Sequence, residues 1–205
     1  MPLSIDKKTA AVLVMDCEND IVHQDGKAAK AIGLGEMIKK KGTLTNIRKV
    51  LDAAREAKVP VFFMVIENDR IPPGQWPHRG EFFQNIVRMG PVLQKGTWGA
   101  EIHEEIKPQA GELVLGKSIL SSFSRSELES ELKKRGVREL ILTGVATNMV
   151  VESTARDGVD RGYSVVTVED GVTSFSDQAH QASIQLLKNI GDVATSDEVS
   201  EALRA

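Results

Sequence analysis

The stretch Ala10–Asp16, AAVLVMD, begins a series of short aliphatic runs that decides the fold class of this 205-residue chain. The runs are nearly continuous in apolar residues, which is typical of strands that are buried on both faces of a parallel sheet. Amphipathic segments separate the runs, as in repeated βαβ units. The further runs are PVFFMVI (60–66), ELVLGK (112–117), ELILTGV (139–145), YSVVTVED (163–170) and the weaker DVATSDEV (192–199).

The segments between these runs predict helices on both faces of the sheet. Ser124 and Glu127 match a capping box, and Gly136 matches the glycine that follows a helix end. Segment 67–109 contains both tryptophans and is predicted to be a loop-like excursion from the strand ends. We therefore predict a single doubly wound α/β domain over residues 1–205, with helices at 45–58, 124–135, 149–161 and 177–189.

Composition excludes several classes of protein. Residues are 41% hydrophobic and 27% charged, and the net charge of −3 is spread without a long block of one sign, so we expect neither a nucleic-acid nor a membrane partner. No apolar run approaches the ~20 residues of a membrane span, and no signal-peptide pattern is present. The single cysteine, Cys17, argues against a disulfide framework and favours a cytoplasmic location.

Polar groups stand at the ends of three of the predicted strands. Asp16 ends the first run, Lys117 ends the third, and the turn 144–148 follows the fourth and opens a helix. Singly, such an aspartate is more often a turn residue, and such a lysine is usually a solvated surface residue. Because ligands of an open parallel sheet bind at the carboxyl ends of its strands, the three together predict a cleft for a small-molecule substrate.

Four motifs along the chain carry a resemblance to a known family: MDCENDIV (15–22), GTWGAEIHEEIKP (96–108), GKSILSSF (116–123) and GVATNMVVESTARD (144–157). In this order they resemble the isochorismatase-like cysteine hydrolases. The resemblance implies a mostly parallel six-stranded sheet in a Rossmann-type three-layer fold, hydrolysis of a small amide or a vinyl ether, and a homodimer or homotetramer. The family's catalytic aspartate, lysine and cysteine correspond to Asp16, Lys117 and Val150.

Valine at position 150 departs from the family pattern, because its hydrocarbon side chain cannot act as a nucleophile. Cys17 is no obvious substitute: adjacent strand residues point to opposite faces, so we expect a buried structural thiol that faces away from Asp16. Thr147 and Ser153 carry hydroxyls, but we expect no histidine partner for either. We therefore expect acid–base hydrolysis without a covalent cysteine intermediate.

The isochorismatase branch of the family also lacks the cysteine, which implies acid–base chemistry through Asp16. This carboxyl is an acid if burial raises its pKa and a base if Lys117 stabilises the carboxylate, and both remain open. The resemblance further implies a cis peptide between Val145 and Ala146, with the amides of Ala146 and Val150 forming an oxyanion site. The alternatives are a catalytically silent member that binds a ligand or partner, and an amidohydrolase whose cysteine was replaced at position 150.

Three further patterns do not indicate a cofactor. Residues 111–118 match the P-loop expression, but strand formers occupy its middle. His103-Glu104 begins like a zinc-protease helix, yet Lys107 stands where the second histidine is required. Glu67 and Asp69 are followed only distantly by His78. We therefore expect neither a metal nor another cofactor.

Aromatic residues of segment 67–109 predict either pocket and subunit contacts or simple packing of a loop onto the domain. These residues are Trp76, Phe82, Phe83 and Trp98. For the substrate pocket itself we predict contributions from Asn19, Trp76, His78 and Phe123.

Overall fold

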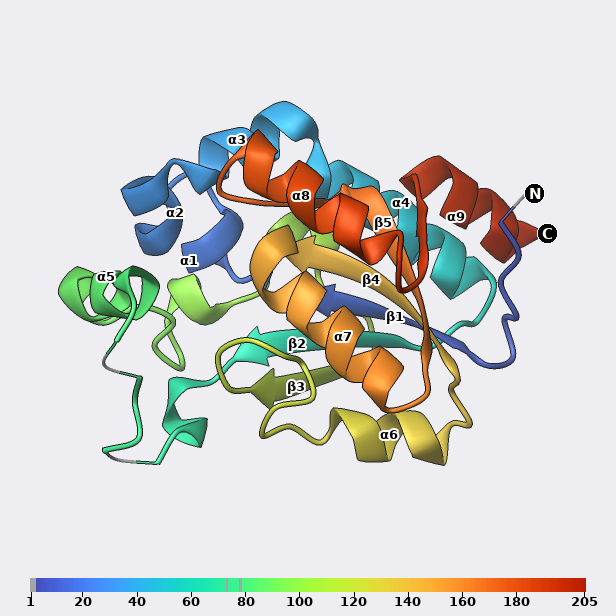
Figure 1. Ribbon diagram of the computed structural model, residues 1–205, viewed down its shortest axis with the longest axis horizontal. Coiled ribbons are helices and arrows are strands. Elements are labelled where there is room, and N and C mark those ends of the chain that lie inside the picture. Colours follow the sequence, from blue (N-terminus) through green and yellow to red (C-terminus); the bar gives the residue numbers. More distant parts are fainter. Residues whose placement is uncertain (1–2, 73, 78) are drawn as a thin grey trace.

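A six-stranded parallel sheet forms the centre of the computed structural model, which describes residues 3–72, 74–77 and 79–205 (Figure 1). The strand order is β3-β2-β1-β4-β5-β6, and every neighbouring pair is parallel. This confirms the predicted fold class. The strands are β1 (Ala10–Met15), β2 (Val61–Ile66), β3 (Leu113–Lys117), β4 (Glu139–Val145), β5 (Ser164–Thr173) and β6 (Asp192–Ala194).

Helices cover both faces of this sheet, because its strands carry apolar side chains on both faces. On one face, α4 and α9 pack against the side chains of Val12, Val14 and Phe63; on the other, α6, α7 and α8 pack against Leu13 and Phe62. Alternate residues of each strand thus enter two separate cores. These helices are α4 (Thr43–Glu56), α6 (Leu128–Lys134), α7 (Glu152–Asp160), α8 (Asp177–Leu187) and α9 (Ser196–Arg204).

Four short helices gather at the carboxyl ends of the strands, on the left in Figure 1: α1 (Asn19–Val22), α2 (Lys27–Ile32), α3 (Leu34–Lys41) and α5 (Glu81–Met89). The connections also contain η1 (Asn68–Arg70), η2 (Trp98–Ala100) and η3 (Glu104–Ile106), and η3 packs against α4. The prediction of a loop over 67–109 is therefore wrong for α5, which Gly80 and Gly90 delimit. None of the helices in the described ranges has both the length and the apolarity needed to cross a membrane.

Two predicted helix boundaries differ from the structure. Helix α6 begins at Leu128 and not at Ser124, because the Ser124 side chain and carbonyl accept hydrogen bonds from Ser118 at 2.9 and 3.1 Å within the preceding loop. The weak run 192–199 ends as a strand at Ala194, since Thr195 caps helix α9. Gly136 follows α6 with a φ of 66°, as predicted.

The ends of β1 and β4 meet where Gly144 pairs with Met15. Gly144 has a φ of 120°, and a Cβ atom at this position would lie 2.1 Å from the Met15 carbonyl oxygen. Only glycine permits this approach. It brings Asp16, the next residue after β1, beside the turn that follows β4.

Candidate active site

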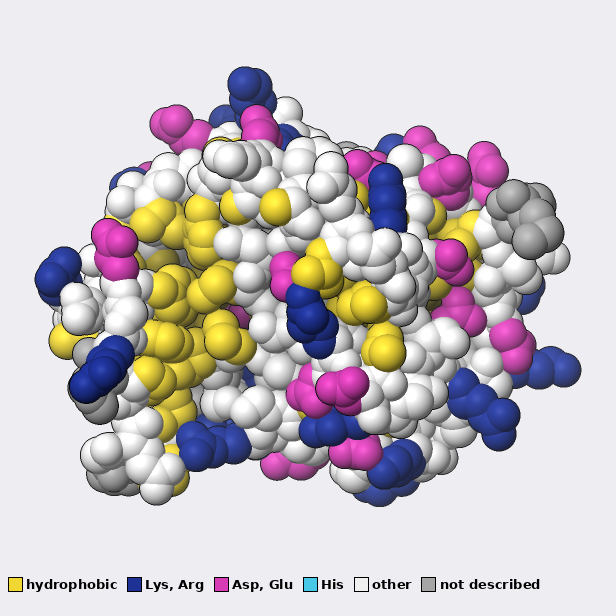
Figure 2. Space-filling model, in the orientation of Figure 1, with side chains coloured by type: hydrophobic (Ala, Val, Ile, Leu, Met, Phe, Trp, Pro, Cys, Tyr) yellow, Lys and Arg dark blue, Asp and Glu magenta, His cyan; other side chains and the backbone are white. Residues whose placement is uncertain are grey.

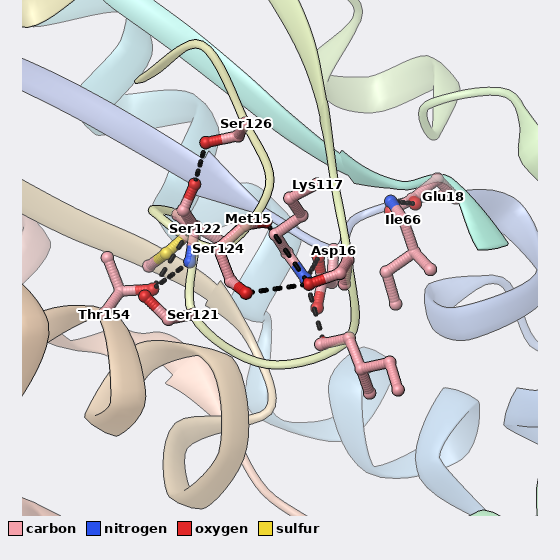
Figure 3. A network of polar contacts seen from close by, with 12 residues as sticks. Met15, Asp16, Glu18, Ile66, Lys117, Ser121, Ser122, Ser124, Ser126 and Thr154 are labelled. Atoms are coloured by element: carbon pink, nitrogen blue, oxygen red, sulfur yellow. Dashed lines mark hydrogen bonds and ion pairs between the residues drawn. The ribbon is translucent and has the colours of Figure 1, made fainter. Parts of the chain in front are cut away.

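Asp16 and Lys117 form an ion pair at the carboxyl edge of the sheet (Figure 3). Lys117 Nζ lies 3.0 Å from Asp16 Oδ1, and both side chains are buried. Asp16 directly follows β1 with a φ of 52°, in the left-handed region that aspartate tolerates better than most residues. Lys117 is the last residue of β3, and β2 lies between the two strands. The lysine side chain therefore extends across the end of β2.

The Lys117 ammonium group makes one ion pair and two hydrogen bonds within the protein. Besides its contact with Asp16, Nζ donates to the carbonyl oxygens of Ser118 at 3.2 Å and Ile119 at 3.0 Å. An ammonium group carries three N–H donors and no acceptor. Lys117 therefore fixes Asp16 and the loop after β3 in one arrangement.

Glu18 adds a second buried carboxyl to this pair. Its Oε1 accepts the backbone N–H of Ile66 at 2.7 Å, whereas no group of the described residues bonds Oε2. Burial raises the pKa of Asp16 to about 6, although Lys117 acts in the opposite direction. Burial and the neighbouring Asp16 raise the pKa of Glu18 to about 8. At neutral pH these shifts favour an ionised Asp16 beside a protonated Glu18.

A cavity of about 240 Å³ opens beside Asp16. Its wall includes Asp16 and the turn residues Val145 and Ala146, and most of the remaining wall is apolar. Figure 2 shows hydrophobic side chains gathered at this end of the molecule, on the side where α2 and α5 lie in Figure 1. The cavity is therefore largely hydrophobic, with the carboxylate of Asp16 at one point of its wall.

The turn after β4 brings Val145 and Ala146 to the cavity wall. The peptide bond between Val145 and Ala146 is cis, as the resemblance implied, and none of the described residues accepts the N–H of Ala146. Thr147–Val151 then form the π-helical turn η4. Val150 does not lie on the cavity wall but in the core beside α6–α8, with 1% of its surface exposed.

The structure places the four predicted pocket residues differently. Trp76 lies on the cavity wall. Asn19 does not, because its side chain donates to the Trp98 carbonyl oxygen at 2.9 Å and ties α1 to η2. Phe123 is also absent from the wall, since its ring stacks on Tyr163 in the core. His78 lies outside the described residues.

Of the three alternative nucleophiles, Cys17 and Thr147 are buried, whereas Ser153 is half-buried and does not line the cavity. Cys17 Sγ lies 3.4 Å from the Met15 carbonyl oxygen, and burial raises the pKa of this thiol. Thr147 has a histidine partner, contrary to the prediction: its Oγ1 lies 2.9 Å from His180 Nδ1. His180 belongs to α8, so only the fold brings the two together. Thr147 has no exposed surface and does not line the cavity.

Two features of the site were not predicted from the sequence. Glu18 could have been found from its position two residues after Asp16 in the motif 15–22. Nothing in the sequence of α2 and α5 indicated that their apolar side chains form a cavity wall. Within the described ranges, no group of three or more His, Cys, Asp or Glu side chains is arranged to hold a metal ion.

A family model described as the isochorismatase domain matches residues 10–198. The chain belongs to the isochorismatase family. Ureidoacrylate amidohydrolase RutB of Agrobacterium fabrum is 33% identical over 207 residues, which cover 95% of this chain and 90% of the relative. As a member of the isochorismatase family, the protein is a hydrolase that acts on small molecules.

Solved structures of the isochorismatase family share its fold. An isochorismatase-like hydrolase from Alkaliphilus metalliredigens is 26% identical with a TM-score of 0.75, covering 95% of this chain and 98% of that one. N-carbamoylsarcosine amidase from Thermoplasma acidophilum is 26% identical with a TM-score of 0.68, covering 92% and 97% respectively.

Proposed function

We propose that this hydrolase cleaves its substrate by general-base catalysis through Asp16, without a covalent cysteine intermediate. The observation that carries the proposal is the Asp16–Lys117 pair, 3.0 Å apart, whose Asp16 lies on the wall of a cavity that Val150 does not line. The pair supports proton transfer, whereas a hydrocarbon side chain at position 150 supports no thioester.

The chemistry assigns one task to each group. The Asp16 carboxylate takes a proton from a water molecule, and the water oxygen attacks the electrophilic carbon of the substrate. The Ala146 N–H donates to the oxygen on which negative charge develops. The proton held by Asp16 then passes to the leaving group as the scissile bond breaks, which restores the carboxylate. Lys117 is a positioning residue that orients Asp16 and balances its charge.

We propose that the site cleaves a C–N bond, because two similar proteins are named an amidohydrolase and an amidase. Cleavage of a vinyl ether would instead begin with proton donation by Asp16. The two reactions have opposite pH dependences, since one requires the carboxylate and the other the carboxylic acid.

We also propose that residues 1–205 act as one domain in the cytoplasm, as a homodimer or homotetramer. A single buried cysteine supports the location, and the exposed Phe82 and Trp98 support a subunit contact. Light scattering at micromolar concentration should give a multiple of the monomer mass; a monomer mass would refute the assembly.

Oxygen labelling tests the mechanism. A panel of neutral amides, esters and vinyl ethers first identifies a substrate, which is then turned over once in ¹⁸O water. General-base catalysis predicts ¹⁸O in the product and none in the protein. Label in the Asp16 peptide on mass spectrometry would show covalent attack by Asp16 and overturn the proposal. Absence of turnover across the panel would favour a silent binder.

A further inference from the structure

We propose that this site takes a neutral substrate with an apolar body the size of a substituted ring, and that it selects against an ionised carboxylate. The inference rests on the proposed function for the reaction and adds the substrate class. It is drawn from the composition of the cavity wall, the bonding of Lys117 and the volume of the cavity.

The wall is apolar almost throughout. Among the described residues that line the cavity, only Asp16, Asn68 and Asn85 carry polar side chains other than the indole of Trp76. The rest are aliphatic or aromatic, and most come from helices α1, α2 and α5 and from the chain after β3, β4 and β5; they include Ile32, Ile86, Leu120, Met149 and Phe175. Such a surface stabilises a bound hydrocarbon group and offers few partners to a charged one.

No lysine, arginine or histidine stands among the described residues of the wall. The adjacent cation, Lys117, does not line the wall, and its ammonium group already contacts Asp16 and the carbonyl oxygens of Ser118 and Ile119. Among the described lining residues, the carboxylate of Asp16 is the only charged group that a bound ligand can contact. A second carboxylate would be repelled by Asp16 and would lose its hydration without gaining a partner. Amide side chains of Asn68 and Asn85 can hydrogen-bond a neutral carbonyl instead.

The volume and the aromatic residues favour a ring. A protein cavity of about 150 Å³ binds benzene, so the cavity of about 240 Å³ has room for a ring with a short substituent. The rings of Phe82 on α5 and Phe175 after β5 lie 6.4 Å apart and join the two sides of the wall. Aromatic pairs at this spacing accept a further ring at an edge or face.

Benzamide and benzoate test the charge preference directly, because the two have nearly the same shape. Titration calorimetry at pH 7.5 should show benzamide binding at least tenfold more tightly than benzoate. Asp16→Asn should leave benzamide affinity within threefold and improve benzoate binding at least threefold, since the repelling charge is removed. Equal or tighter binding of benzoate by the wild type would overturn the inference.

A matched pair on helix α5 tests whether the wall sets this preference. Ile86 lines the cavity, whereas its neighbour Val87 is 63% exposed and does not. Ile86→Lys should weaken benzamide binding and strengthen benzoate binding, while Val87→Lys should leave both unchanged. If both variants melt like the wild type and neither alters the ratio, the ligand does not occupy this cavity and the inference is wrong.

The binding and turnover results separate this inference from the proposed function. A preference for benzamide, with no hydrolysis of any neutral amide, ester or vinyl ether, supports the neutral apolar site and contradicts the proposed reaction. Hydrolysis confined to substrates that bear a carboxylate, such as ureidoacrylate, supports the reaction and overturns the inference. For a series of neutral amides, kcat/KM should rise about fourfold per added methylene until the cavity is full.

Discussion

Lys117 Nζ reaches Asp16 Oδ1 at 3.0 Å across the end of strand β2. Strands two places apart in a sheet are separated by roughly 9.5 Å, a gap that the lysine and aspartate side chains bridge together. The pair therefore links the carboxyl ends of β1 and β3 across β2. It also places an ionisable carboxylate on the cavity wall in a fixed position.

Removing the Asp16 carboxylate should abolish turnover. Asp16→Asn keeps the shape of the side chain but cannot accept a proton from water, so kcat should fall by about 10²- to 10⁴-fold. Steady-state kinetics on a substrate from the neutral panel measure this loss. Asp69→Asn, a change to an exposed residue beyond β2, is the matched control and should retain full activity. Activity above a tenth of wild type in Asp16→Asn would contradict the assigned role.

The pH profile should reveal the raised pKa of Asp16. A general base works as the carboxylate, so kcat/KM should rise with pH through about 6 and level off above neutrality. Rates measured from pH 4.5 to 8, with circular dichroism to confirm folding at each pH, check this expectation. A rate that falls through the same range would instead identify Asp16 as the acid, as vinyl ether cleavage requires.

Glu18→Gln should stabilise the protein at alkaline pH. The folded-state pKa of Glu18 is raised from 4.5 to about 8, so the native state holds the proton more tightly and stability falls as pH rises between these values. Glutamine keeps an acceptor for the Ile66 N–H and does not titrate. At pH 9 the variant should melt at least ~3 °C above wild type, corresponding to about 1 kcal/mol. Glu101→Gln, at an exposed position, should show no such gain.

Thiol reagents should leave activity unchanged. Cys17 is the only cysteine, it is buried, and its raised pKa keeps it in the unreactive thiol form. Iodoacetamide should therefore label the native protein slowly and the unfolded protein fully, as intact mass spectrometry will show. Rapid inactivation that parallels labelling of the native protein would mean that Cys17 takes part in catalysis.

The Thr147–His180 hydrogen bond should contribute to stability and not to chemistry. Thr147→Val leaves the His180 ring nitrogen without its partner inside the protein, which should cost about 1–3 kcal/mol of unfolding free energy. Denaturant unfolding measures that loss, and kcat should remain within a few-fold of wild type. Loss of activity in Thr147→Val together with its recovery in Thr147→Ser would identify Thr147 as the nucleophile.

The sequence determined the architecture because it is encoded locally. Short continuous apolar runs such as 10–16 and 139–145 are typical of strands covered on both faces, and the polar residues Asp16 and Lys117 mark the ends of runs 10–16 and 112–117. The cis peptide between Val145 and Ala146 was also predicted from the sequence, because motif 144–157 resembles that of the isochorismatase family.

Tertiary structure alone decided which distant groups meet. Ser124 does not cap helix α6, because Ser118 engages it, and Phe123 leaves the pocket for a core position beside Tyr163. The pairing of Thr147 with His180 depends on how α8 packs on the turn after β4. The apolar cavity wall and the raised pKa values of Asp16 and Glu18 arise from burial, and burial is a property of the packed chain that no single segment encodes.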